Sequence, residues 1–239
     1  ASSLIAKGSL FALAKALAGI PVKGRAPLAG YDRALFGPAW YDADGNGCDT
    51  RNDILRRDLT ERTMKAGTGG CVVLSGTLHD PYSGRTLAFV RGMGTSSAVQ
   101  IDHVVALGDA WQKGAQQLSS AQRVALANDP LNLLAVSGSA NQAKGNGDAA
   151  TWLPAAKPFR CAYVARQVAV KVKYRLWMTQ AEHDAVQRIL ATCPGQGQTG
   201  QSGQNSGAIA IVLDGTDITA PTVNGPDLAS DQFQITGNF

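Results

Sequence analysis

The stretch from Gln100 to Trp111, QIDHVVALGDAW, places an acid and an imidazole side by side inside a run of strand-forming residues. The β-branched residues around the pair favour an extended chain. Because neighbouring side chains of a strand point to opposite faces, Asp102 and His103 cannot both decorate one exposed surface. A half-buried strand with one satisfied polar face is the simplest interpretation, but the residues that follow favour another.

Two further segments extend this polar pattern. Residues 129–138, DPLNLLAVSG, predict a second strand that begins near Asn132. Residues 139–153, SANQAKGNGDAATWL, predict a short helix that frays at its glycines, with Asn141 and Lys144 three residues apart on one face. A strand with Asp-His, a strand beginning with Asn and a helix with Asn-x-x-Lys form a ββα arrangement. The hairpin and the helix of such a unit face each other across a small cleft.

The rest of the chain predicts an α+β fold in which helices predominate. Its 239 residues are enough for one good-sized domain. Residues 4–20 predict an amphipathic helix packed on that domain, because large apolar residues recur there at helical spacing. The other expected elements are a helix at 50–65, two strands joined by a Pro-Tyr-Ser-Gly turn at 71–92, two short helices at 108–129 of which the second is capped by Ser119 or Ser120, and two helices at 159–193.

Composition and charge change at Pro194. Residues 194–207, PGQGQTGQSGQNSG, are typical of a flexible linker, and residues 208–239 form a β-prone acidic tail to which we assign no function. Residues 194–239 contain four Asp and no Lys or Arg, so all 22 basic and 14 of the 18 acidic residues lie in residues 1–193. The single domain expected at 1–193 therefore has a net charge of +8, which suits a polyanionic partner.

Four widely spaced cysteines indicate the compartment in which the chain works. They form no Cys-x-x-Cys pair, which argues against a structural zinc site or a redox dithiol. Scattered cysteines in even number favour disulfides and a secreted, extracellular protein, with four buried thiols in a cytosolic protein as the alternative. Three pairings are open, and the sequential one closes two moderate loops. No apolar run is long enough to span a bilayer, so we expect no membrane partner. We also expect a monomer. The cysteines are Cys48, Cys71, Cys161 and Cys193.

The polar series of residues 102–148 resembles the HNH nucleases of the His-Me finger, or ββα-metal, group. It is most similar to a secreted bacterial branch related to the C-terminal nuclease domain of GmrSD-type restriction enzymes. In that resemblance the three letters fall on His103, Asn132 and Asn141. The likeness runs from about Pro21 to Cys193 and includes GYDRALFGPAW, CDTRNDILRRDL and NQAKGNGDAATWLP. It implies a ββα-metal core within the disulfide-stapled domain.

The resemblance also implies a role for each polar residue. His103 is the general base, which agrees with the ability of a neutral imidazole to take a proton from water near neutral pH. Asp102 and Asn141 hold a metal ion, and two protein oxygens plus waters suit Mg²⁺ or Mn²⁺. Asn132 orders the hairpin and orients the imidazole. Lys144 is expected to touch the phosphate, and Arg91, just before the strand, is a weaker phosphate-binding candidate.

A second motif resembles a calcium loop. The segment DADGNGCDTRND places Asp42, Asp44, Asn46 and Asp53 at positions 1, 3, 5 and 12, with Gly47 at position 6. Position 12 is Asp in place of the usual Glu, and no helix is expected before the loop. A Gly- and Asn-rich turn tied by Cys48 is therefore the favoured interpretation. A bound Ca²⁺ would have a structural role.

These patterns predict a secreted, metal-dependent endonuclease that hydrolyses phosphodiester bonds of DNA, with RNA as a further candidate, and with little sequence specificity. The resemblance implies products with 5′-phosphate and 3′-hydroxyl ends. The competing interpretation is an extracellular calcium-binding structural or binding module with a decayed nuclease-like core. The intact set from Asp102 to Lys144 favours the enzyme, because a decayed nuclease is expected to lose at least one of these residues.

Overall fold

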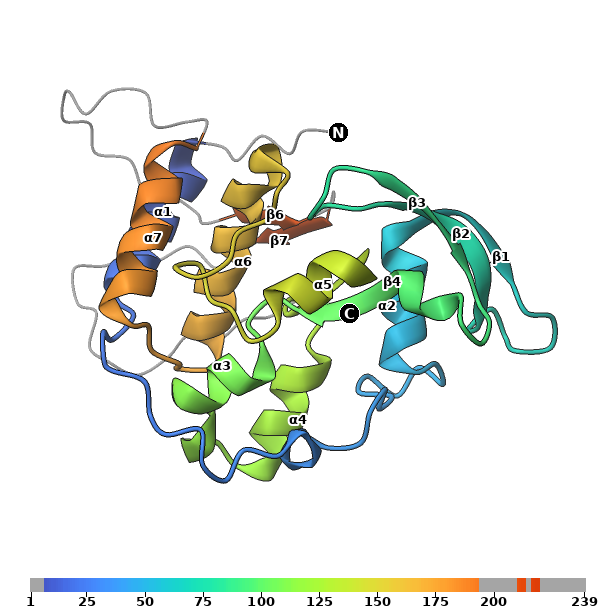
Figure 1. Cartoon of the computed structure of the whole chain (residues 1–239), viewed down its shortest axis with the longest axis horizontal. Helices are drawn as coiled ribbons and strands as arrows, with labels where there is room; N and C mark the ends of the chain where they lie inside the picture. The colour runs from blue at the N-terminus through green and yellow to red at the C-terminus, as the bar shows by residue number, and fades with distance from the viewer. Residues whose placement is uncertain (1–6, 194–209, 214–215, 220–239) are drawn as a thin grey trace.

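The computed structural model describes residues 7–193, 210–213 and 216–219, and the fold is α+β (Figure 1). Two disulfides cross-link it. The described helices are α1 (Lys7–Ala18), α2 (Thr50–Asp58), α3 (Leu107–Gln112), α4 (Ser120–Asn128), α5 (Gly138–Lys144), α6 (Arg160–Lys173) and α7 (Gln180–Ala191), with short 3-10 helices η1 (Arg33–Phe36), η2 (Ser96–Ala98), η3 (Ala115–Gln117) and η4 (Lys157–Phe159). The described strands are β1 (Leu59–Met64), β2 (Val73–His79), β3 (Thr86–Val90), β4 (Val99–His103), β5 (Leu133–Ser137), β6 (Ala210–Leu213) and β7 (Thr216–Thr219).

A two-stranded antiparallel sheet carries the Asp-His pair. β4 pairs with β5 so that Asp102 lies opposite Leu134 and His103 opposite Leu133. α5 begins directly after β5 and packs against both strands, and Figure 1 shows it beside β4. α5 stops at Lys144 because the next residue, Gly145, has a φ of 52°, which an L side chain rarely adopts. The predicted strand–strand–helix unit is therefore present.

The two faces of this sheet are buried in different parts of the core. Val99 and Ile101 of β4 pack with residues of α2 and of the three-stranded sheet β1–β2–β3. Leu134 and Val136 of β5 pack with residues of α1, α6 and α7. Because successive side chains alternate between faces, a slip of one residue would turn both apolar sets the wrong way. Burial on both sides thus fixes the register of the Asp-His pair.

The segment 50–65, predicted as one helix, is a helix followed by a strand. α2 begins after Asp49, whose side chain accepts a hydrogen bond from the Asn52 backbone N–H, and ends at Asp58. The Asp58 carboxylate accepts from the Ala135 backbone N–H at 2.8 Å, which holds this helix end against β5. Residues 59–64 then pair with β2 as the edge strand β1. The hydrogen-bonded pairing of β1 with β2 outweighs the helical spacing of apolar residues, which is weak after the end of α2.

Most other predicted elements are confirmed. β2 and β3 pair antiparallel and are joined by the segment that contains the Pro-Tyr-Ser-Gly turn. α4 is capped by Ser119, which forms a capping box with Gln122. Leu13, Leu17 and Ile20 are buried with residues of α6 and α7, so the N-terminal helix packs on the domain. In the tail β6 and β7 form an antiparallel pair. The predicted linker, 194–207, lies outside the described residues.

Both disulfides follow the sequential pairing, and all four cysteines are bonded. Cys48–Cys71 joins the segment before α2 to the loop between β1 and β2, and Cys161–Cys193 joins the start of α6 to the end of α7. In the loop-entropy model each stabilises the fold by ~3 kcal/mol. Within the described part of the chain, no helix combines the length and apolar character that crossing a bilayer requires.

Six charged side chains from distant segments form what we call the ionic cluster. At its centre, Lys113 Nζ lies 2.6 Å from Asp109 Oδ1, 2.7 Å from Asp148 Oδ2 and 2.5 Å from Glu182 Oε2. The other two cations each bridge two of the same three carboxylates. Three positive and three negative charges therefore compensate one another inside the fold. The cluster consists of Arg25, Asp109, Lys113, Asp148, Lys171 and Glu182.

Candidate active site

A cavity of about 240 Å³ lies where the end of β4, the start of α3 and α5 meet. Asp102, His103 and Asn141, predicted from three sequence positions to act together, all line it. We call it the His103 cavity. Tyr31, Arg33 and Asn146 also line it. All three lie in segments that carry the family likeness, GYDRALFGPAW and NQAKGNGDAATWLP, but the sequence pattern assigned none of them a role.

His103 is nearly buried and is fixed by one ring nitrogen. Its Nε2 lies 2.9 Å from the backbone oxygen of Ala127 in α4. A carbonyl oxygen can only accept, so Nε2 carries the proton and Nδ1 keeps a lone pair. Among the described residues Nδ1 has no hydrogen-bond partner, and His103 lines the cavity, so the Nδ1 lone pair is not taken up by the protein.

The protonation state of His103 suits a base. Burial, and then the positive charge of Arg33, lower the pKa of His103 to about 3, while the hydrogen bond to Ala127 opposes the shift. The imidazole is therefore neutral at physiological pH with a free lone pair on Nδ1, although so low a pKa makes it a weaker base than an ordinary histidine.

Asn132 does not line the cavity but supports the segments that do. Its side chain is fully buried, and its Oδ1 accepts a hydrogen bond from the Val105 backbone N–H at 2.8 Å. Its Nδ2 donates to the backbone oxygens of Val105 and Leu126. Asn132 thereby ties the segment after β4 to the last turn of α4, which provides the Ala127 carbonyl that holds His103.

Asp102 is buried beneath the cavity with both carboxylate oxygens engaged. Lys144 Nζ donates to Oδ1 at 2.9 Å, and the Tyr82 hydroxyl donates to Oδ2 at 2.5 Å. Burial raises the pKa of Asp102 above its ordinary value, and the contacts with Lys144 and Tyr82 only partly oppose the shift. Burial and the charge of Asp102 raise the pKa of Tyr82, which therefore stays a donor. Each carboxylate oxygen retains a further lone pair.

Lys144 differs from its expected role as a phosphate contact. Its side chain is fully buried, and its Nζ donates to the backbone oxygen of His103 at 2.7 Å as well as to Asp102. A buried carboxylate requires a nearby cation, and among the described residues Lys144 is the cation that pairs with Asp102. The ammonium group therefore lies under the site and supports it.

Asn141 offers one free oxygen to the cavity. Its Nδ2 donates to Gln100 Oε1 at 2.9 Å, which orients the amide. Its Oδ1 has no hydrogen-bond partner among the described residues. The described residues contain no group of three or more His, Cys, Asp or Glu placed to hold a metal ion. One carboxylate and one amide oxygen at a wet cavity instead fit a hydrated ion of the Mg²⁺ type, which keeps most of its waters.

Arg91 takes a structural role in place of the expected phosphate contact. Its Nε donates to the Val73 backbone oxygen at 2.6 Å and its NH2 to Asn52 Oδ1 at 2.5 Å. These bonds fasten the end of β3 to β2 and α2. Its guanidinium is not part of the cavity lining.

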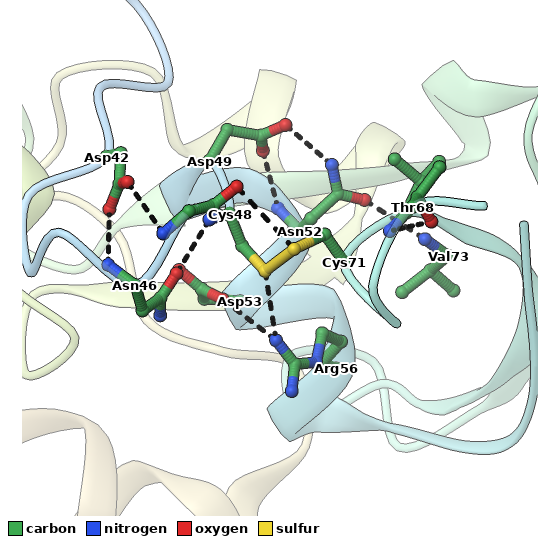
Figure 2. The surroundings of a disulfide bond; sticks show 12 residues. Asp42, Asn46, Cys48, Asp49, Asn52, Asp53, Arg56, Thr68, Cys71 and Val73 are labelled. Carbon is green, nitrogen blue, oxygen red and sulfur yellow. Dashed lines mark hydrogen bonds and ion pairs between the residues drawn. A yellow bond between two sulfur atoms is a disulfide. The ribbon is translucent and has the colours of Figure 1, made fainter.

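The calcium-like loop closes on its own backbone (Figure 2). The Asp42 carboxylate accepts from the backbone N–H groups of Asn46 and Gly47, and Asp44 accepts from the backbone and side chain of Asn46. Asp53 pairs with Arg56 at 3.4 Å and lines one cavity with Asp44 and Asn46. The loop thus has the hydrogen bonds of the favoured turn, which the Cys48–Cys71 disulfide ties to the hairpin. A larger cavity of about 640 Å³ beside it is lined by acids and arginines and contains no imidazole.

Comparison with known proteins finds one matching family model and one similar secreted protein. The model of the C-terminal domain of GmrSD restriction endonucleases matches residues 49–189. An uncharacterized secreted protein of Arthroderma benhamiae is 38% identical over 179 residues, which cover 74% of this chain and 82% of the relative. No solved structure matches significantly. The two disulfides and the secreted relative place the protein among secreted proteins.

Proposed function

Because the chain belongs to the family of the GmrSD restriction endonuclease C-terminal domain, we propose that it is a secreted, metal-dependent endonuclease. The proposed substrate is DNA, with RNA as a further candidate, and cleavage has little sequence specificity. The β4–β5–α5 unit is then a ββα-metal core of the HNH type. One observation carries the proposal: His103 and Asn141 line one cavity with Asp102, and His103 Nδ1 and Asn141 Oδ1 have no other partner among the described residues.

The base in this mechanism is His103. Nδ1 accepts the proton of a water molecule, which then attacks the phosphorus of the scissile bond. The bond from Nε2 to Ala127 fixes the tautomer that leaves Nδ1 free, and Asn132 fixes the position of that carbonyl. The proton moves to a neutral imidazole, so the reaction needs no prior deprotonation of the enzyme.

Asp102 and Asn141 would hold the metal ion. A Mg²⁺ or Mn²⁺ ion held there would supply positive charge to stabilise the negative charge that develops during the reaction. Gln100 orients Asn141, while Lys144 and Tyr82 hold the Asp102 carboxylate in place. These contacts fix the two oxygen ligands before substrate arrives, and the expected products have 5′-phosphate and 3′-hydroxyl ends.

The test is nicking of a supercoiled plasmid with Mg²⁺, Mn²⁺ or EDTA. We expect His103→Ala to reduce the nicking rate by at least about a hundredfold, because it removes the general base. His79→Ala is the matched control, since His79 lies on an exposed strand end away from the cavity lining. Thermal melting of both variants should stay close to wild type. A His103→Ala variant that nicks at the wild-type rate would overturn the mechanism.

Asn141→Ala tests the metal assignment separately. Loss of the Oδ1 ligand should lower the rate and raise the metal concentration that gives half-maximal nicking. Gln142→Ala, an exposed neighbour on the same helix, should leave that concentration unchanged. The same assay with single-stranded DNA and with RNA determines the order of substrate preference.

A further inference from the structure

We propose that Arg33 binds a phosphate group of the nucleic acid at the mouth of the His103 cavity. The inference rests on the proposed function. Lys144 and Arg91 were the expected phosphate contacts, but both are bonded to other groups of the protein, so we assign the phosphate contact to Arg33.

Arg33 is an exposed cation in the lining of the cavity. It is exposed, and it lines the same cavity as His103 and Asn141. Within the described residues its guanidinium makes no hydrogen bond or ion pair. Buried or half-buried arginines such as Arg25 and Arg91 donate to protein oxygens. The guanidinium of Arg33 is thus available to a ligand.

The backbone that carries Arg33 is held firmly in place. Asp32 caps η1 by accepting a hydrogen bond from the Ala34 backbone N–H at 2.8 Å. At the other end of η1, Phe36 is buried and its ring packs edge-on against that of Trp111 in α3. Tyr31, on the other side of Arg33, also packs edge-on against Trp111. Arg33 is therefore an exposed side chain on a fixed turn.

The same helix positions both Arg33 and the proposed base. Arg123 of α4 donates to the Leu35 backbone oxygen at 3.0 Å. Gly37, with a φ of 87°, approaches α4 so closely that a Cβ there would lie 2.7 Å from Val124 Cγ2. The last turn of α4 provides the carbonyl that binds His103 Nε2. A phosphate on Arg33 and a water on His103 would thus be held relative to one another through α4.

The chemistry of the guanidinium matches a phosphodiester. Two of its parallel N–H groups can bind two phosphate oxygens, and its charge releases one condensed counterion from the polyanion. Because the contact is to the backbone, it would strengthen binding to any sequence. A single strong contact of this kind agrees with an endonuclease of little sequence specificity.

Binding without cleavage is measured first. A fluorescent DNA oligonucleotide is titrated with protein in EDTA over a range of salt concentrations. We expect Arg33→Ala to bind about tenfold more weakly near about 0.1 M salt and to reduce the slope of log K against log salt by about 1. Arg188→Ala is the matched control, because Arg188 is exposed on α7, lies outside the cavity lining and makes no ion pair within the described residues. It should retain the wild-type affinity and slope.

Cleavage kinetics then separate the inference from the proposed function. With Mg²⁺, Arg33→Ala should raise KM more than it lowers kcat, and Arg33→Lys should recover part of the loss. If wild type cleaves and Arg33→Ala behaves like Arg188→Ala in both assays, the inference is overturned and the nuclease remains. If wild type cleaves nothing with any metal while Arg33→Ala still loses binding and salt dependence, the nuclease fails and the phosphate site stands.

Discussion

The ionic cluster and the His103 cavity both hold polar side chains away from water, yet they satisfy them in opposite ways. In the cluster three cations meet three carboxylates, and Lys113 alone contacts all three. At the cavity Asp102 has one cation, Lys144, and atoms of His103 and Asn141 lack partners among the described residues. An unpaired polar atom inside a fold costs free energy. The cluster avoids this cost and contributes to stability, whereas the cavity accepts it and leaves two atoms available to a ligand.

The carboxylates of the two regions show the same contrast. Burial raises the pKa of Asp148, but Lys113 and Arg25 together outweigh it, so this pKa lies below its ordinary value. Burial also raises the pKa of Asp102, and there Lys144 and Tyr82 do not outweigh it. Folding thus favours the charge on Asp148 and disfavours the charge on Asp102. A second cation near Asp102 would reduce that cost.

Lys113→Met should break the cluster and give the largest loss of stability. Three buried carboxylates would then share two cations, and an uncompensated buried charge costs about 3–5 kcal/mol. Urea unfolding at neutral pH measures the loss. The control is Lys173→Met. Lys173 is exposed, and its buried partner Asp129 keeps the hydrogen bond from Tyr174, so the loss should be less than about 1 kcal/mol. If Lys113→Met and Lys173→Met lose the same free energy of unfolding, the ionic cluster contributes no more to stability than a surface ion pair.

Lys144→Met should affect stability and activity together. It removes the only cation that pairs with Asp102 among the described residues, with an expected cost of about 3 kcal/mol, and it frees the carbonyl of His103. The nicking rate of the folded variant should therefore fall, whereas Lys113→Met should keep its rate per folded molecule. If Lys144→Met is unstable but fully active, Lys144 supports the fold alone.

Acid should weaken the ionic cluster through Asp148. The pKa of Asp148 is lowered in the fold, so its contribution is present above the unfolded pKa of about 3.9 and is lost as pH falls through the folded value. The melting temperature is measured from neutral to acid pH, and it should fall once the pH drops below the unfolded pKa of Asp148. In Asp148→Asn the melting temperature should start lower and depend less on pH. If wild type and Asp148→Asn show the same dependence of melting temperature on pH, Asp148 does not contribute to the acid sensitivity.

Added metal should stabilise the cavity and leave the cluster unaffected. If Mg²⁺ binds at Asp102 and Asn141, a concentration ten times the dissociation constant adds about 1.4 kcal/mol to the free energy of unfolding. The melting temperature of wild type and of Lys113→Met should rise by similar amounts, and that of Asn141→Ala should rise less. An equal rise in all three would place the metal elsewhere.

Local signals in the sequence predicted much of the unit that carries the site. The strand pattern around Asp102 gave β4, and the glycines after Lys144 gave the end of α5. Of the two caps predicted, Ser119 or Ser120, the structure has Ser119, which forms a capping box with Gln122. The helix expected through residue 65 ended at Asp58, since pairing of β1 with β2 depends on residues far along the chain.

The sequence by itself determined which chemistry is present: an imidazole, an acid and an amide on two strands and a helix, and four cysteines fit for disulfides. Only the tertiary structure decided which of these groups face water. It buried Lys144 under Asp102, assigned Arg91 to the sheet, brought Arg33 to the cavity and joined six charges from distant segments. The reason is that burial and charge compensation arise from contacts between remote residues, which leave no periodic trace along the chain.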